Sequence, residues 1–166
     1  MMHLYLLRHG IAEDYSARGT DAERKLVPEG KDKTRDVMEA LAEMKYPVPD
    51  IVISSTLIRA KETAEIAIKE FATGAILEEN EALVPAADTM DTMMLVEKVF
   101  RDHKVVMFVG HEPHLSSFGS ALLGLPRSGI EMKKSAVALF ELMNADAPRV
   151  RGVLVGLFPP RVGNLA

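Results

Sequence analysis

Cysteine is absent from this chain of 166 residues, and so is tryptophan. Without cysteine the protein has no disulfide bond, no thiolate nucleophile and no sulfur-ligated metal site. Its apolar runs are far shorter than the roughly 20 residues that a membrane-spanning helix needs. The first run is preceded by no basic leader and stops at Arg8. We therefore expect no secretory signal and no membrane span, which favours a cytoplasmic protein.

An excess of positive charge is also missing. The chain carries 20 basic and 24 acidic residues, for a net charge of -4 at neutral pH. This balance argues against a nucleic acid or an anionic membrane as the main partner, although a single pocket can still be basic. Neither the G-x-x-x-x-G-K-[ST] loop nor the G-x-G-x-x-G fingerprint occurs, so the common nucleotide-binding folds lose their main support.

Short apolar runs alternate with segments of helical periodicity along the whole chain. We expect strands where the apolar runs are short and helices where apolar residues recur every three or four positions. The expected strands lie at residues 4–7, 51–54, 75–77, 104–109, 136–142 and 150–158, and the expected helices at residues 29–44, 57–71, 89–100 and 113–123. The last two strands are joined by a short turn and are expected to pair antiparallel. The polar stretch 13–25 shows neither period and is expected to be a loop.

This alternation predicts an α/β fold. We expect a three-layer α/β/α sandwich that has a mostly parallel sheet and an antiparallel C-terminal edge. A chain of 166 residues, 48% of them hydrophobic, can bury one sizeable core. We therefore expect a single domain over residues 1–166.

Chemically useful side chains follow three of the expected strands. Arg8 and His9 end the first strand, Arg59 lies in the first turn of the helix after the second, and His111 follows the strand at 104–109. In an open α/β sheet, ligands bind beyond the carboxyl ends of the strands, so these residues are candidates for one site. A single arginine next to a histidine at a strand end is more often a surface pair. Three such strand ends together favour a site.

These residue types suit phosphoryl transfer. Guanidinium groups are planar, permanently charged donors that bind phosphoryl oxygens, a role that fits Arg8 and Arg59. His9 is the expected nucleophile, because a neutral imidazole attacks phosphorus through one nitrogen while the other donates to a fixed acceptor. His111 would be a further donor, in either its protonated or its neutral form. Because these groups supply the positive charge, we expect no metal ion and no cofactor.

The segment from His111 to His114 invites a metal-site interpretation. Its two histidines are three positions apart and enclose a proline. The H-E-x-x-H motif of zinc enzymes instead places its histidines four apart on one helix face. We therefore expect no metal site here, and we expect His114 either behind the pocket or exposed.

Further motifs accompany these residues. They are Leu7-Arg8-His9-Gly10 with Ala12, Arg24-Lys25-Leu26-Val27-Pro28-Glu29-Gly30, Ser54-Ser55, Arg59-Ala60 with Thr63-Ala64, Leu83-Val84-Pro85 with Asp88, and Gly110-His111-Glu112-Pro113-His114-Leu115-Ser116. Together they resemble the histidine phosphatase superfamily, in the branch that includes phosphoglycerate mutase, and most of all its small phosphohistidine phosphatases of the SixA type. The chain departs from the family pattern at Lys25 and Thr56, where proline is frequent, and at Glu62, where glutamine is common.

The resemblance implies a phosphoglycerate mutase-like fold and a covalent mechanism. By this resemblance His9 is the phosphorylated nucleophile, and Arg8, Arg59 and His111 form the phosphate pocket. Arg24 is implied as a further phosphate-binding residue. The departures from the pattern leave this charged set complete.

The leading functional hypothesis is a metal-independent phosphohistidine phosphatase in signal transduction. Its partner would be a phosphohistidine-bearing protein such as a histidine phosphotransfer domain. Larger members of the branch use a glutamate as general acid, which Glu81 and Asp88 match only loosely, so neither is assigned. An imidazole leaves more readily than an alkoxide, so a poorly defined acid favours a phosphoramidate substrate. The segment between Arg59 and His111 has room only for core helices and a short connection, which favours an open cleft.

Two alternatives stay open at this point. One is a phosphatase for a small phosphate ester, such as a sugar phosphate or a nucleotide, because open clefts also accept small molecules. The other is a noncatalytic phosphate-binding module, although a module that only binds has no need of a nucleophile such as His9.

Overall fold

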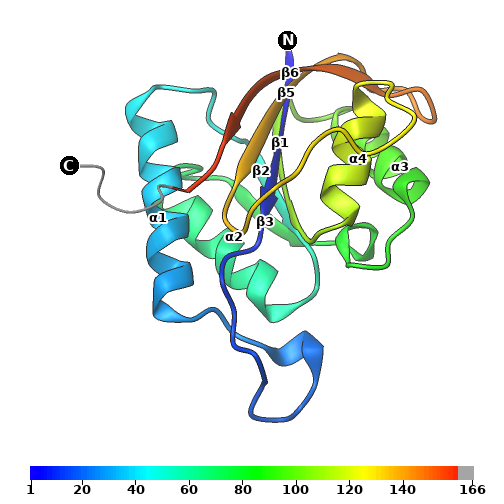
Figure 1. Cartoon of the computed structure of the whole chain (residues 1–166). Coiled ribbons are helices and arrows are strands. Elements are labelled where there is room, and N and C mark those ends of the chain that lie inside the picture. The colour runs from blue at the N-terminus through cyan, green and yellow to red at the C-terminus, as the bar shows by residue number, and fades with distance from the viewer. Residues whose placement is uncertain (161–166) are drawn as a thin grey trace.

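Within residues 1–160, which the computed structural model describes, six strands form one mixed sheet (Figure 1). The strands are β1 (Met2–Arg8), β2 (Ile51–Ser54), β3 (Ile76–Glu79), β4 (Val105–Gly110), β5 (Val137–Asn144) and β6 (Arg151–Phe158). Their order across the sheet is β3-β2-β4-β1-β5-β6. The first four strands pair in parallel, whereas β5 and β6 are antiparallel to their neighbours. The expected mostly parallel sheet with an antiparallel C-terminal edge is confirmed.

Helices cover both faces of this sheet. They are α1 (Pro28–Glu43), α2 (Ile58–Glu70), α3 (Thr89–Val99) and α4 (His114–Leu122), with short 3-10 helices η1 (Asp21–Glu23) and η2 (Glu81–Leu83). Helices α1 and α2 pack on one face, and α3 and α4 pack on the other, so the sheet is the middle of three layers (Figure 1). None of the described helices has both the length and the apolar character needed to cross a membrane.

The central strand β1 carries its apolar residues to both faces. Leu4 and Leu6 pack on the side of α3 and α4, and Tyr5 and Leu7 pack on the side of α1 and α2. All four are fully buried. A parallel strand covered on both faces is apolar throughout, which explains the unbroken run in the sequence. The run ends at the half-buried Arg8, where the chain reaches the carboxyl end of the sheet.

The element boundaries lie within two residues of those expected from the sequence. Strand β3 extends through Glu78 and Glu79, because it is an exposed edge strand whose backbone pairs with β2 at polar positions as well as apolar ones. The polar stretch 13–25 contains η1 and is closed by a bridge between Ala12 and Leu26. Hydrogen-bonded turns produce no periodic pattern of apolar residues. The sequence pattern therefore could not predict the regular structure within residues 13–25.

Candidate active site

The carboxyl ends of neighbouring strands bring the two expected site histidines together. His9 follows β1 and His111 follows β4, and these strands pair so that Arg8 lies opposite Gly110. The backbone N–H of His9 donates to the carbonyl of Gly110 at 3.0 Å. The centroids of the two imidazole rings are 5.0 Å apart. Two residues more than 100 positions apart in sequence therefore face one small volume.

His9 is held as a neutral imidazole of one tautomer. Its Nδ1 lies 2.7 Å from the carbonyl oxygen of Gly10. A carbonyl oxygen only accepts, so Nδ1 carries the proton and Nε2 carries the lone pair. The pKa of His9 is lowered to about 4, mainly by burial and also by the positive charges of Arg59 and Arg8, against the opposing effect of the Gly10 hydrogen bond. At neutral pH the ring is therefore uncharged.

His111 is also buried and neutral. Its Nε2 lies 2.7 Å from the hydroxyl of Ser55, which in turn accepts the backbone N–H of Leu57 at 3.2 Å. Burial lowers the pKa of His111 to about 3, and the nearby His9 and Arg59 act in the same direction. The buried Nδ1 atom of this ring has no hydrogen-bond partner in residues 1–160. Of the two protonation states considered for His111, the structure favours the neutral one.

Arginine side chains from β1 and α2 extend toward the same volume. Arg59, the second residue of α2, is 5% exposed and donates through one terminal nitrogen to the carbonyl of Asp21 at 2.9 Å. Its other terminal nitrogen lies 3.2 Å from the carboxylate of Asp21. Arg8 donates to the carbonyl of Met132 at 2.9 Å. The Nε atoms of both arginines are buried and, over the described part of the chain, lack a partner.

Arg24 joins this group through Asp21. One terminal nitrogen of Arg24 lies 2.8 Å from the Asp21 carboxylate, and its Nε donates to the backbone carbonyl of Glu13. Asp21 therefore bridges Arg24 and Arg59. The sequence interpretation missed Asp21, which stands in a polar loop without periodicity. The only local signal is its position one helical turn before Arg24.

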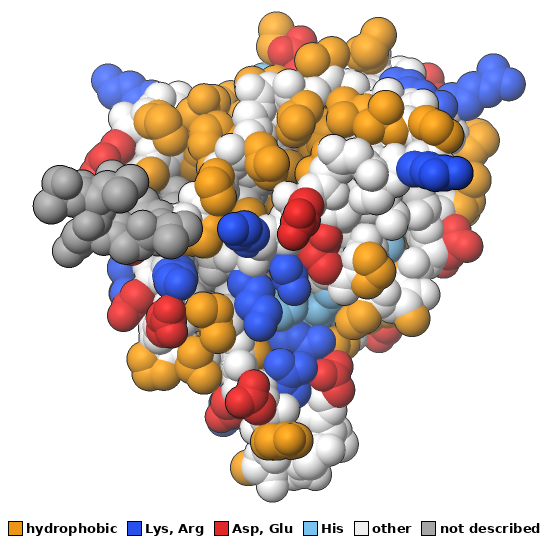
Figure 2. Space-filling model, viewed as in Figure 1, with side chains coloured by type: hydrophobic (Ala, Val, Ile, Leu, Met, Phe, Trp, Pro, Cys, Tyr) orange, Lys and Arg blue, Asp and Glu red, His pale blue; other side chains and the backbone are white. Residues whose placement is uncertain are grey.

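The pocket is basic although the chain as a whole is acidic. Figure 2 shows Lys and Arg side chains gathered around His on the face viewed, with Asp and Glu side chains beside them. The excess of acidic residues behind the net charge of -4 therefore lies outside this cluster. Buried guanidinium and N–H groups at the carboxyl end of a parallel sheet form a site that can bind an anion and present a nucleophile to it.

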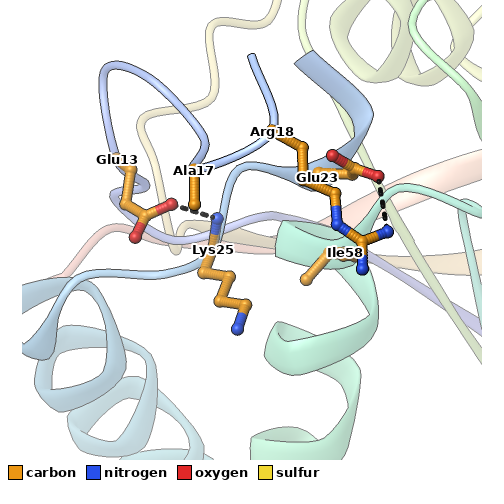
Figure 3. Close-up of a pocket in the computed structure, with 6 residues that line it drawn as sticks. All are labelled: Glu13, Ala17, Arg18, Glu23, Lys25 and Ile58. Carbon is orange, nitrogen blue, oxygen red and sulfur yellow. Dashed lines mark hydrogen bonds and ion pairs between the residues drawn. The ribbon is translucent and has the colours of Figure 1, made fainter. Parts of the chain in front are cut away.

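A cavity of about 340 Å³ lies next to the start of α2 (Figure 3). Its lining residues come from the 13–25 loop and from the residue before Arg59: Glu13, Ala17, Arg18, Glu23, Lys25 and Ile58. The Glu13 carboxylate accepts the backbone N–H of Lys25 at 3.0 Å, and Arg18 pairs with Glu23 at 3.5 Å (Figure 3). The loop therefore supplies a charged wall beside the arginines.

The remaining polar residues considered from the sequence lie elsewhere. His114 is 4% exposed, lies 2.8 Å from the hydroxyl of Thr92 and stacks on Phe118 in the layer of α3 and α4. An exposed position for His114 is therefore wrong. Asp88 accepts the backbone N–H of Met90 at 2.7 Å and caps α3, and Glu81 is exposed in η2.

The fold and the pocket define an α/β protein that can bind an anion beside two histidines. Comparison with known proteins identifies its family. Residues 4–83 match the model of the histidine phosphatase superfamily (branch 1). A Picosynechococcus sp. protein described as uncharacterized is 30% identical over 139 residues, which are 82% of each chain. The chain belongs to the histidine phosphatase superfamily.

Solved structures of the same fold include phosphatases with different substrates. The protein histidine phosphatase SixA complexed with tungstate superposes with a TM-score of 0.84 at 22% identity, over 96% of this chain and 97% of that one. A putative phosphohistidine phosphatase SixA from Nakamurella multipartitia gives a TM-score of 0.80 at 21% identity, over 97% of both chains. A mycobacterial glucosyl-3-phosphoglycerate phosphatase gives 0.72 at 18% identity, over 97% of this chain and 100% of that one. Family membership and fold together support phosphatase activity.

Proposed function

We propose that this protein is a phosphohistidine phosphatase that hydrolyses phosphorylated histidine on a partner protein. Such a partner, for example a histidine phosphotransfer domain, would place the protein in cytoplasmic signal transduction. In this proposal His9 is the nucleophile, and Arg8, Arg24, Arg59 and His111 bind the phosphoryl group. The whole chain acts as one domain.

The make-up of the segment between Arg59 and His111 carries this proposal. It consists of the rest of α2, β3, η2, α3 and β4, all of which belong to the sheet or its covering layers. No further helix or strand is inserted in that segment to cover the strand ends. Imidazole atoms are visible from outside among Lys and Arg side chains (Figure 2). A phosphohistidine is a short side chain fixed to a bulky protein, so it needs this open approach.

The two carboxylates considered as a general acid also bear on the substrate. Asp88 is engaged as the cap of α3, and Glu81 is exposed in η2. An alkoxide leaving group depends on a proton donor, whereas an imidazole, with a reference pKa of about 6.5, leaves with far less help. If neither carboxylate supplies that proton, the site is better matched to a phosphoramidate than to an ester.

The reaction proceeds in two displacements. His9 Nε2 attacks phosphorus while the P–N bond to the substrate imidazole breaks, and that imidazole, protonated on its other nitrogen, leaves as a neutral ring. The phosphorylated His9 ring is cationic, and the Gly10 carbonyl stabilises its Nδ1–H. Water then attacks phosphorus, the bond to His9 breaks, and inorganic phosphate leaves with the oxygen of the water.

The test is the release of phosphate in the presence of EDTA from a histidine phosphotransfer domain phosphorylated chemically with phosphoramidate. The wild-type protein is expected to release phosphate from this substrate, and His9→Ala is expected to release none. His103→Ala is the matched control, because His103 lies in the turn before β4, at the amino end of the strand that carries His111 at its other end. Activity of His9→Ala equal to that of His103→Ala would contradict the role of His9.

A small phosphate ester is the second candidate substrate. The cavity of about 340 Å³ beside α2 falls within the range of roughly 300–1,000 Å³ that small-ligand sites occupy. The same assay therefore includes sugar phosphates and nucleotides. Turnover of an ester without turnover of the phosphoprotein would replace the proposed function with this one.

A further inference from the structure

We propose that Asp21 is a positioning residue of the phosphoryl pocket, whose carboxylate holds the guanidinium groups of Arg59 and Arg24 in place for the phosphoryl group. The inference rests on the proposed function, in which both arginines bind that group. It assigns a role to an acidic side chain inside a site that must attract anions, where an acid is otherwise unfavourable.

The terminal nitrogens of the Arg59 guanidinium are hydrogen-bonded to Asp21, whereas its Nε is not. Its two terminal nitrogens donate to the backbone carbonyl and the carboxylate of Asp21, at 2.9 and 3.2 Å. Its Nε is buried and unpartnered within the described residues. A guanidinium fixed along one edge keeps its remaining N–H groups, Nε–H among them, in fixed directions, so the phosphoryl group meets donors that are already oriented.

The second carboxylate oxygen of Asp21 binds another guanidinium group, that of Arg24 in the loop. It lies 2.8 Å from a terminal nitrogen of Arg24, whose Nε donates to the carbonyl of Glu13. Two guanidinium groups in one small volume repel each other, and a carboxylate between them offsets that repulsion. The hydrogen bond from Arg24 keeps the pKa of Asp21 below its usual range, so the bridge persists in mildly acidic solution.

Asp21 also fixes the wall of the adjoining cavity. The cavity is lined by loop residues on either side of Asp21 and by Ile58, the residue before Arg59. In Figure 3 the loop segments lie over the start of α2, held by the Glu13–Lys25 and Arg18–Glu23 contacts. The bond from Asp21 to Arg59 connects this loop to α2 at the phosphoryl pocket itself.

The experiment measures the affinity for inorganic phosphate by titration calorimetry, together with kcat and KM on the phosphoprotein. The variant is Asp21→Asn, which keeps the backbone carbonyl and the side-chain size but turns one accepting oxygen into a donor that faces a guanidinium. The matched control is Asp14→Asn, which removes the same charge from an exposed position of the same loop. Because the Asp21 side chain is 62% exposed, the variant is expected to fold, which circular dichroism checks.

An effect of charge alone and an effect of positioning predict opposite changes in the phosphate affinity of Asp21→Asn. Removal of a negative charge beside an anion site tightens phosphate binding if charge alone decides. If Asp21 positions the arginines, Asp21→Asn weakens phosphate binding about tenfold and lowers kcat more than it raises KM, since misplaced groups cost most in the transition state. Asp14→Asn is expected to bind phosphate at least as tightly as wild type. Tighter or unchanged binding by Asp21→Asn would overturn the proposal.

Phosphate affinity also separates this inference from the proposed function. It does not depend on which phosphorylated substrate the enzyme hydrolyses. A wild-type protein that binds phosphate but fails to hydrolyse the phosphoprotein would contradict the proposed function alone. Asp21→Glu supplies a second variant, because it keeps both oxygens on a side chain one methylene longer. It is expected to recover part of the lost affinity, and no recovery would count against a role for the carboxylate.

Discussion

Burial sets the charge of both pocket histidines. Desolvation is the largest cause of the lowered pKa of His9 and of His111, and nearby positive charges, that of Arg59 among them, act in the same direction. A protonated His9 could not attack, because its lone pair would be bound to a proton. The Gly10 carbonyl selects the tautomer and, in the proposed mechanism, favours the cationic ring that forms when Nε2 is phosphorylated. One hydrogen bond would thus serve both states of the proposed nucleophile.

Ser55 is expected to orient His111 during catalysis. Its fully buried hydroxyl lies 2.7 Å from Nε2 of His111. Ser55→Ala leaves the imidazole without this contact, so kcat is expected to fall about tenfold, and stability by about 1 kcal/mol. Steady-state kinetics and thermal unfolding measure the two effects.

Ser54→Ala is the matched control for Ser55. Ser54 is equally buried, and its hydroxyl donates to the carbonyl of Ser55 at 2.9 Å rather than to a histidine. The two variants should lose similar stability but differ in kcat. If kcat fell equally in both, the Ser55 hydroxyl would have a structural role only.

Single residues differ in how far the sequence predicts their place. The positions of His9 and His111 are readable because each follows an apolar run at a strand end. Asp21 reaches Arg59 across 38 positions of sequence, a contact that no local pattern records. The burial of His114 was readable in principle, since Phe118 and Leu122 follow it at helical spacing on the inner face of α4.

At the scale of elements, the first turn of α1 supports the loop that follows His9. A Cβ atom at Gly30 would overlap the carbonyl oxygen of Ile11 and lie 2.8 Å from its nitrogen. The Val27 backbone N–H donates to the same carbonyl at 3.0 Å. Backbone therefore packs on backbone, next to the Gly10 carbonyl that holds His9. Only glycine leaves room for this approach.

Gly30→Ala is expected to destabilise the fold by about 3 kcal/mol and to lower kcat, because the loop must move away from α1. Urea unfolding and steady-state kinetics measure both. Gly119→Ala in α4 is the control, since its Cβ would meet side-chain carbons of Ile130 and Phe140 at 3.3 Å, which can yield. Helix propensity also favours alanine there by about 1 kcal/mol. Equal losses in the two variants would exclude a special approach at Gly30.

Over the whole molecule, the alternation of periods was sufficient to predict the layers, because the helices bury an apolar face against the sheet and the central strand β1 is apolar on both of its faces. The order of the strands in the sheet could not be predicted from the periodicity of the sequence. Strands β1 and β4 pair across about 100 positions, and this pairing creates the pocket. The family motifs provided what periodicity could not, since they mark the residues that meet at that edge.

The folded protein as a whole should lose stability in mild acid through its buried histidines. The pKa of His9 is lowered from 6.5 to about 4 and that of His111 from 6.5 to about 3. Between pH 6.5 and these values, the two histidines are protonated in the unfolded chain but not in the folded protein. The free energy of unfolding therefore falls as the pH falls. Above that window the contribution is fully present. Each histidine accounts for about 2 kcal/mol between about pH 6.5 and about pH 5.

Urea unfolding at about pH 7 and about pH 5 tests this linkage. Carboxylates titrate in every variant, so the informative quantity is the difference from wild type. His9→Gln and His111→Gln should each lose about 2 kcal/mol less than wild type on acidification, while His103→Gln controls for the substitution itself. A loss equal to that of wild type in both pocket variants would mean that these histidines take up protons as readily in the folded protein as in the unfolded chain. His9 would then be largely protonated in mild acid, and its attack on phosphorus would require a base that removes this proton.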